Sequence, residues 1–164
     1  MGGFTYRIQG LRELDAKMAQ LGGDASTRIV RKGLRAAGMV FVESIQRSAA
    51  GLKRWPQRTA ESTALLLGAI ADDIGMRMGK DDDGLPAAIV GPGPTTRHVA
   101  HFVEYGHRLV KGGRNRKGRG GPGKVIGEVP QYPFIRTGFE GAAGTAVDTF
   151  VTTVREAVES EAKK

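Results

Sequence analysis

The sequence predicts an α+β protein with long helices toward both ends, short antiparallel strands between them and a long glycine-rich basic loop. Two long segments, 24–48 and 137–162, carry apolar residues at spacings of three and four, as one face of an α-helix does. Between them, two short strand-like runs flank the sequence KDDDG, which is a strong turn signal. The stretch VKGGRNRKGRGGPGK at 110–124 supplies the loop.

The first part of the chain is expected to form one strand and two helices. Residues 4–9 alternate apolar and polar side chains, which predicts a half-buried strand. Residues 11–21 follow as a helix that ends at two glycines. Asp24 or Ser26 can cap the second helix, in which Gly33 and Gly38 can let another segment approach closely. Its predicted apolar stripe consists of Val30, Leu34, Ala37, Phe41 and Ile45.

The middle of the chain is predicted to form short helices and strands. Residues 51–62 form a connector that contains Pro56, which breaks helices. We expect a short helix at 63–71, strands at 73–79 and 85–90, and an amphipathic helix at 97–105.

The last part combines a strand with the second long helix. A strand is expected at 124–129, bounded by Pro130, and Phe134 and Ile135 are the apolar residues that can anchor the last helix. The predicted apolar stripe of that helix consists of Phe139, Ala143, Val147, Phe150, Val154 and Val158.

The composition limits the class of protein. A chain of 164 residues is a usual length for one domain, and we expect a single domain over 1–164. The absence of cysteine excludes disulfides, thiolate metal sites and a cysteine nucleophile. The N-terminus does not resemble a signal peptide, and the most apolar run, residues 64–71, is far shorter than a membrane span, so we expect a soluble protein without a membrane partner.

The positive charge of the chain is concentrated in one segment. The net charge is +8, and residues 108–124 hold seven basic residues and no acidic one. The glycine content makes ordering costly and the like charges repel, so we expect a flexible loop that orders only in a complex. The residues expected to bind a partner are Arg108, Lys111, Arg114, Arg116, Lys117, Arg119 and Lys124.

The histidines near residue 100 are the strongest candidate for a metal site. His98, His101, Glu104 and His107 recur every three residues, but the order H-E-x-x-H of a zinc protease helix is absent. An ordinary amphipathic helix with Val99, Phe102 and Val103 buried is the preferred interpretation. Because the chain shows no base–nucleophile set either, we expect no enzyme and no cofactor.

Three motifs occur in the order found in one known family. They are YRIQGLRELDAKMAQL, HVAHFVEYGH at 98–107 and VPQYPFIRTGFEGA at 129–142. Together they resemble the small tail-completion and head–tail joining proteins of long-tailed phages, a tail-terminator-like family named after a lambdoid gene product. His107 and Thr137-Gly138 depart from the family pattern. The residues that match its motifs are Phe102, Glu104, Tyr105, Gly106, Pro133, Phe134 and Arg136.

The resemblance implies a non-catalytic virion protein with a small sheet packed by long helices. Such a protein forms a ring at the head-proximal end of the tail, terminates the tail tube and joins it to the head connector. We expect six copies, with twelve as the alternative, and contacts with the tail tube protein, the connector or stopper protein and, non-specifically, DNA in the lumen. Its expected location is the virion, after assembly in the host cytoplasm.

Two alternatives remain open from the sequence. A basic-loop nucleic-acid-binding accessory protein is the second interpretation, because basic residues and glycine also suit phosphate contacts. However, no aromatic residue for base stacking lies between Gly106 and Pro130. A metal-dependent hydrolase that uses the histidines is the third.

Overall fold

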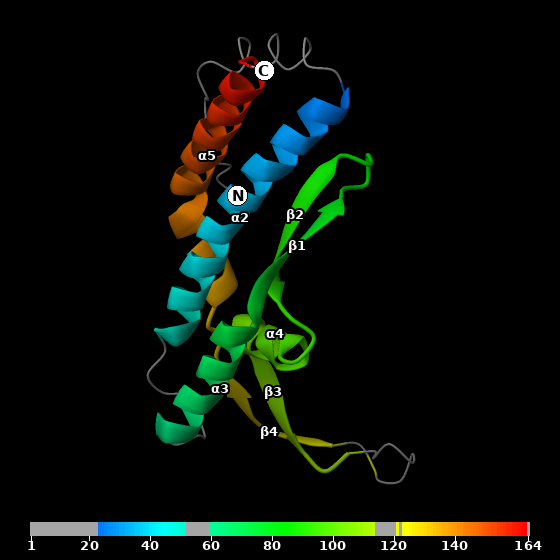
Figure 1. The fold of residues 1–164 in the computed structure, drawn as a ribbon. Helices are drawn as coiled ribbons and strands as arrows, with labels where there is room; N and C mark the ends of the chain where they lie inside the picture. Colours follow the sequence, from blue (N-terminus) through cyan, green and yellow to red (C-terminus); the bar gives the residue numbers. More distant parts are fainter. Residues whose placement is uncertain (1–22, 52–59, 114–120, 122, 164) are drawn as a thin grey trace.

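The computed structural model describes residues 23–51, 60–113, 121 and 123–163. The predicted strand at 4–9, the predicted helix at 11–21 and most of the connector lie outside these residues. So do four of the basic residues expected to bind a partner, Arg114, Arg116, Lys117 and Arg119. The described part contains helices and two antiparallel strand pairs, which confirms the α+β class (Figure 1). None of its helices is long and apolar enough to cross a membrane.

Two long antiparallel helices, α2 (Gly23–Ala50) and α5 (Phe134–Glu161), lie side by side along one side of the fold (Figure 1). Glycines bring them close together. A Cβ atom on Gly138 would lie 2.6 Å from the Cα atom of Ile45, and one on Gly33 would lie 2.5 Å from a methyl group of Val154. Real Cβ atoms do not approach other atoms so closely, so the helices can pack at this separation only because both positions lack a side chain.

The buried face of each long helix matches the predicted stripe only in part. Ala37 and Ile45 of α2 and Val154 and Val158 of α5 are buried as predicted. Val30, Leu34 and Phe41 are only partly buried, and Phe139 is 51% exposed. Phe41 and Phe139 stack on each other with ring centroids 4.3 Å apart, so these large rings flank the contact instead of filling it. The buried residues are Ile29, Gly33, Ala37, Gly38, Val42, Ile45 and Ala49 in α2, and Phe134, Gly138, Ala142, Ala146, Val154, Ala157 and Val158 in α5.

A β-hairpin packs against α2. Helix α3 (Ala60–Asp73) leads directly into strand β1 (Ile74–Lys80), which pairs with β2 (Pro86–Pro92) in the antiparallel sense. The Met76 side chain of β1 lies against Gly38 of α2, where any larger residue would collide with it. Both strands and the turn between them confirm the sequence prediction to within two residues.

One aspartate closes the turn of this hairpin and another holds its opposite end. An oxygen of Asp81 accepts hydrogen bonds from the backbone N–H groups of Asp83, at 3.1 Å, and Leu85, at 2.7 Å. The Asp73 carboxylate accepts one from the N–H of Thr96, at 2.7 Å, and one from its hydroxyl, at 2.8 Å. These bonds close the KDDDG turn and position the start of α4 (Arg97–Tyr105), whose bounds match the prediction.

A second hairpin projects from the body of the protein (Figure 1). Strand β3 (His107–Lys111) pairs in the antiparallel sense with β4 (Lys124–Val129), and this pair forms a separate two-stranded sheet. The prediction placed Arg108 and Lys111 in the basic loop, but both lie in strand β3. Lys124 begins β4, whose bounds confirm the strand predicted at 124–129. Strand β3 was not predicted because Leu109 and Val110 are consecutive apolar residues and break the alternation of apolar and polar side chains. The bulge of this pair lies in β4, since Leu109 pairs with Gly127 and Val110 with Val125, which leaves Ile126 as the extra residue.

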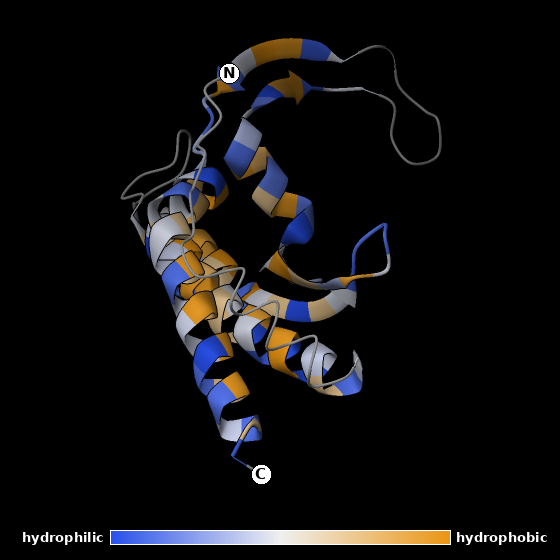
Figure 2. Cartoon of the chain, turned by 90° about the horizontal axis from the view of Figure 1, so that it is seen from above, coloured by the Kyte–Doolittle hydropathy of each residue, from blue (hydrophilic) through white to orange (hydrophobic). Residues whose placement is uncertain are grey.

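The main hydrophobic core lies where α2, α3, α4 and the start of α5 meet. Phe134 is 1% exposed and packs in this cluster with residues such as Ile45, Ile70 and Val103, as the sequence predicted for an anchor of the last helix. Figure 2 shows apolar residues concentrated among the helices and a second apolar segment on the β3–β4 hairpin, away from them. The base of the β3–β4 hairpin is therefore attached to the core, and the tip of the hairpin lies away from the core.

The close helix contact predicts a specific stability difference. Gly138→Ala adds a Cβ atom that meets the backbone of Ile45, whereas Gly141→Ala, in the same helix, adds one that meets nothing within 4 Å. Both variants gain the same helix propensity, so the clash alone separates them. We expect Gly138→Ala to be less stable than Gly141→Ala by about 1–3 kcal/mol in urea unfolding. Equal stability of the two variants would contradict the tight contact.

Candidate functional site

Helix α4 and the start of α5 are joined through one buried carboxylate. Glu104 is only 3% exposed, and its oxygens accept hydrogen bonds from the backbone N–H groups of Ile135, at 2.8 Å, and Arg136, at 3.2 Å. These N–H groups belong to the first turn of α5, where Pro133 at the N-cap position makes no side-chain capping bond. A negative charge at a helix N-terminus is stabilising, so Glu104 serves as the cap of a different helix.

Gly106 lets the chain turn from α4 into β3. Its φ angle is +69°, and a Cβ atom there would lie 2.5 Å from the carbonyl oxygen of Val129 and 2.9 Å from the nitrogen of Gln131. Any residue with a side chain would therefore be strained and would collide with the strand end. The glycine sets the angle at which the second hairpin leaves the body.

Tyr132 connects the base of the hairpin to two helices. Its backbone N–H donates to the carbonyl of Val103, and its hydroxyl donates to the carbonyl of Ser48, both at 2.8 Å. The Ser48 carbonyl lies at the C-terminal end of α2, where such groups lack partners within the helix. Together with Glu104 and Gly106, these bonds give the hairpin a rigid base.

The residues that match the phage family motifs divide into two groups. Glu104 and Phe134 are buried, Gly106 makes the turn and Pro133 stands at the start of α5. Phe102, Tyr105 and Arg136 are exposed; Phe102 at 42% corrects the expectation that it is buried. Phe102 instead lies beside the rings of His101 and His107, with centroids 3.9 Å and 5.0 Å away.

The histidine candidate for a metal site does not assemble. His98 and His101 are exposed on α4, whereas Glu104 is buried and occupied by helix N–H groups. Among residues 23–51, 60–113 and 123–163, no group of three or more histidine or carboxylate side chains could hold a metal ion. The described structure thus offers no support for the metal-dependent alternative.

We call residues 107–111 and 124–129 the hairpin arm. Arg108 pairs with Glu128 across its strands at 3.5 Å, and both side chains are about three-quarters exposed, so the pair is a weak surface contact. Lys111 lies directly opposite Lys124 near the tip. Like charges opposite each other destabilise a strand pair, so the tip is suited to receive negative charge from outside.

The hairpin arm also exposes apolar side chains, which the sequence analysis did not identify as part of a site. Val110, Val125 and Ile126 are 53%, 49% and 56% exposed, and Val110 pairs with Val125 across the strands. The signal in the sequence is the short apolar runs, Leu109-Val110 and Val125-Ile126, that flank the basic loop on both sides. Exposed apolar groups next to cations are typical of a surface that a protein partner covers.

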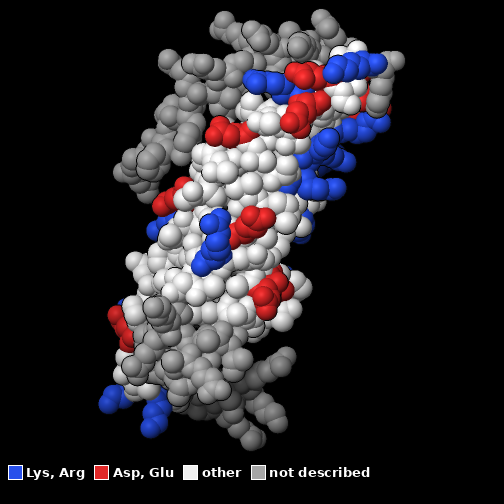
Figure 3. Space-filling model, turned by 60° about the vertical axis from the view of Figure 1, so that its left-hand side comes forward, with Lys and Arg blue, Asp and Glu red and all other residues white. Residues whose placement is uncertain are grey.

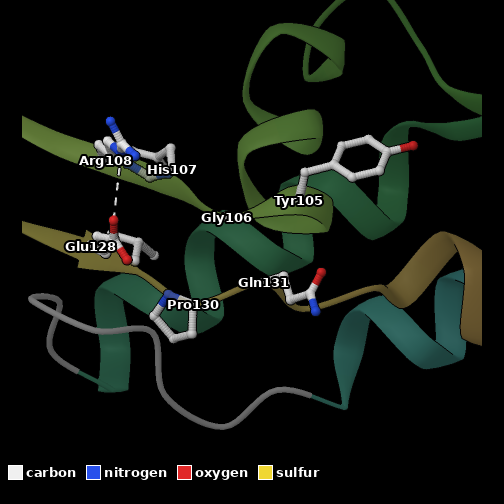
Figure 4. A pocket seen from close by; sticks show the side chains of 8 residues that line it. Tyr105, Gly106, His107, Arg108, Glu128, Pro130 and Gln131 are labelled. Carbon is white, nitrogen blue, oxygen red and sulfur yellow. Dashed lines mark ion pairs between the residues drawn. The ribbon is translucent and has the colours of Figure 1, made fainter.

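An open hollow of about 440 Å³ lies between the end of α4 and the base of the hairpin arm (Figure 4). Tyr105, Gly106, Arg108, Glu128 and Gln131 are among the residues that line it, and the Arg108–Glu128 ion pair lies on its arm side. Small-molecule sites are enclosed and largely apolar, whereas this hollow is open and polar. Its shape therefore favours contact with a macromolecule.

A comparison with protein-family models gives one match. Residues 12–106 match the family described as "HK97-gp10_like: Bacteriophage HK97-gp10, putative tail-component". The match covers more than half of the 164 residues, includes α2, α3, the β1–β2 hairpin and α4, and ends directly before the hairpin arm. No curated protein and no solved structure matches the chain.

The capping role of Glu104 predicts a loss of stability on truncation. Glu104→Ala leaves two N–H groups of the α5 N-terminus without an acceptor in a buried position. We expect the free energy of unfolding to fall by about 1.5–3 kcal/mol, since hydrogen bonds to a charged group are being removed. The matched control is Glu140→Ala, an exposed carboxylate on α5, which should change stability by less than about 0.5 kcal/mol. Similar effects of the two substitutions in urea unfolding would rule out the cap.

Proposed function

The chain belongs to the HK97-gp10-like family of bacteriophage tail components, and on this premise we propose that it is a structural protein of the head–tail junction. In this proposal it forms a ring at the head-proximal end of the tail, terminates the tail tube and joins it to the head connector. Its location is the virion, and its assembly takes place in the host cytoplasm. The partners are further copies of itself, six in a closed ring, together with the tail tube protein and the connector or stopper protein.

The observation that carries the proposal is the division of the described chain into a rigid body and a projecting arm. The body is held by the α2–α5 contact and by Glu104. The hairpin arm exposes Val110, Val125 and Ile126 beside two lysines that make no ion pair with a described residue. A subunit in a closed ring presents two different surfaces, one to each neighbour. A stiff base with an uncovered arm suits such a heterologous contact.

No catalytic step is part of the proposal. Three carboxylates are occupied by structural hydrogen bonds: Glu104 caps α5, Asp73 positions Thr96, and Asp81 closes a turn. These roles require acceptors that stay in place. These three carboxylates thus hold the shape of the described chain, which supports a structural role.

Nucleic-acid binding is the second candidate, and one further observation favours it. Four exposed basic residues lie within two turns of α2, and Figure 3 shows basic side chains gathered along one side of the helix pair. They are Arg28, Arg31, Lys32 and Arg35. Such a stripe can contact phosphates.

We favour a protein partner for the hairpin arm over DNA for two reasons. Phosphate contacts would not require the exposed valines and Ile126. Moreover, each neutralised phosphate adds about 0.9 to the salt dependence of DNA affinity, so a ring of many such contacts would hold the genome and hinder its passage. Contacts between the ring and DNA in the lumen are therefore proposed to be weak and non-specific.

The proposal predicts how loss of the basic loop charges affects assembly. Changing Arg114, Arg116, Lys117 and Arg119 to Ser should impair the joining of purified heads to tails, because electrostatics sets the orientation and rate of encounter. The deficit relative to the wild type should be largest at low salt and shrink at higher salt, which screens the steering that the variant has lost. The wild-type subunit should bind DNA only weakly. Joining at the wild-type rate, combined with tight DNA binding by the wild-type subunit, would favour the nucleic-acid function instead.

A further inference from the structure

Exposed apolar side chains gather on the two β-hairpins. Of the nine large apolar residues that are exposed in the described chain, five lie there, so these hairpins carry much of the uncovered apolar surface. Leu85, at 60%, and Ile89, at 43%, belong to the β1–β2 hairpin. Val110, Val125 and Ile126 belong to the hairpin arm. Patches of this kind on a small protein indicate contact surfaces.

The two hairpins carry opposite charge next to these residues. Asp82 and Asp83 stand in the turn directly before Leu85, and Lys111 and Lys124 stand beside Val110 and Val125. None of these four charged side chains makes an ion pair with another described residue. Each hairpin thus combines exposed apolar groups with charges that lack a partner in the described chain.

The two hairpins of one chain do not meet each other. Figures 1 and 2 both show that they leave the body in different directions, with their tips far from one another. The complementary surfaces can therefore come together only between two molecules. We infer that the hairpin arm of one subunit docks on the β1–β2 hairpin of a second copy of this chain, with Lys111 and Lys124 facing Asp82 and Asp83.

This contact rests on the proposed function, because a ring supplies the second copy in a fixed orientation. It is heterologous, since each subunit gives its arm to one neighbour and its acidic turn to the other, and such contacts close into rings. Docking buries valine and isoleucine side chains and relieves the repulsion between the two opposed lysines. An isolated two-stranded sheet is only marginally stable, so the added contacts also stabilise both hairpins.

The basic stripe of α2 offers a competing partner for the acidic turn. Arg31 and Lys32 are exposed and also lack an ion-pair partner among the described residues. However, α2 exposes only Met39, at 45%, among its large apolar residues, whereas the arm exposes three. The combination of charge and apolar surface therefore favours the hairpin arm as the partner of the acidic turn, and variants of α2 serve as the control.

Crosslinking tests the contact in assembled particles. The chain has no cysteine, so Leu85→Cys and Val125→Cys introduce two exposed thiols that a short bismaleimide can join. Particles assembled with the full-length double variant should give a ladder of covalent oligomers on denaturing gels, up to the full ring. Each single-cysteine variant should remain monomeric, because the two positions meet only each other.

The outcomes separate this inference from the proposed function. If the double variant is present at the neck of joined particles and gives no ladder, the docking inference is wrong while the proposed function stands. If the protein is absent from the particles, the proposed function fails and the docking contact fails with it. A ladder from either single-cysteine variant would also overturn the inference, because it would indicate contact between identical surfaces.

Charge reversal tests the pairing of the two hairpins. One variant carries Asp82→Lys and Asp83→Lys, leaving Asp81 to close the turn, and the other carries Lys111→Glu and Lys124→Glu. Each alone should lower incorporation into particles about tenfold or more, whereas an equimolar mixture should restore it, because every contact in an alternating ring then joins opposite charges. Arg31→Glu with Lys32→Glu should leave incorporation unchanged. A mixture that fails to recover, or a loss caused by the α2 variant alone, would contradict the pairing.

Discussion

The contact between Gly138 and the backbone of Ile45 is the constraint on which the rest of the structure depends. It fixes where the first turns of α5 lie on α2. Only with α5 in that place can Phe134 fill the core and the N–H groups of Ile135 and Arg136 reach Glu104. Since Glu104 belongs to α4, the same contact sets the position of α4 and, through Gly106, the direction of the hairpin arm.

Most helices and strands follow from the sequence because their signals are local. The KDDDG turn, the apolar spacing of residues 97–105 and Pro130 each act within a few residues, and the described elements agree with them. The buried faces of α2 and α5 were predicted less well, since a stripe drawn from large apolar residues overlooks a contact made through glycine and alanine. Such a contact becomes visible only when both helices are placed together.

The candidate site was only partly predictable for a related reason. The basic residues were identified from their charge, but strand β3 was not predicted, because the adjacent apolar residues Leu109 and Val110 break the alternation expected of a strand. The role of Glu104 depends on N–H groups more than thirty residues away, so no local pattern reports it. The motif that contains it indicated the family, while the structure explains it physically as a brace between two helices.

A rigid body with an exposed arm suits a subunit that assembles with other subunits. The central claim is that this tail component forms a ring at the head–tail junction. Electron cryomicroscopy of intact particles tests it most directly. The account predicts a closed ring of this chain between the head connector and the last ring of tail tube subunits, with α2 and α5 recognisable as a close antiparallel pair in each subunit. Density for the chain at another position in the tail, or as isolated copies without a ring, would contradict it.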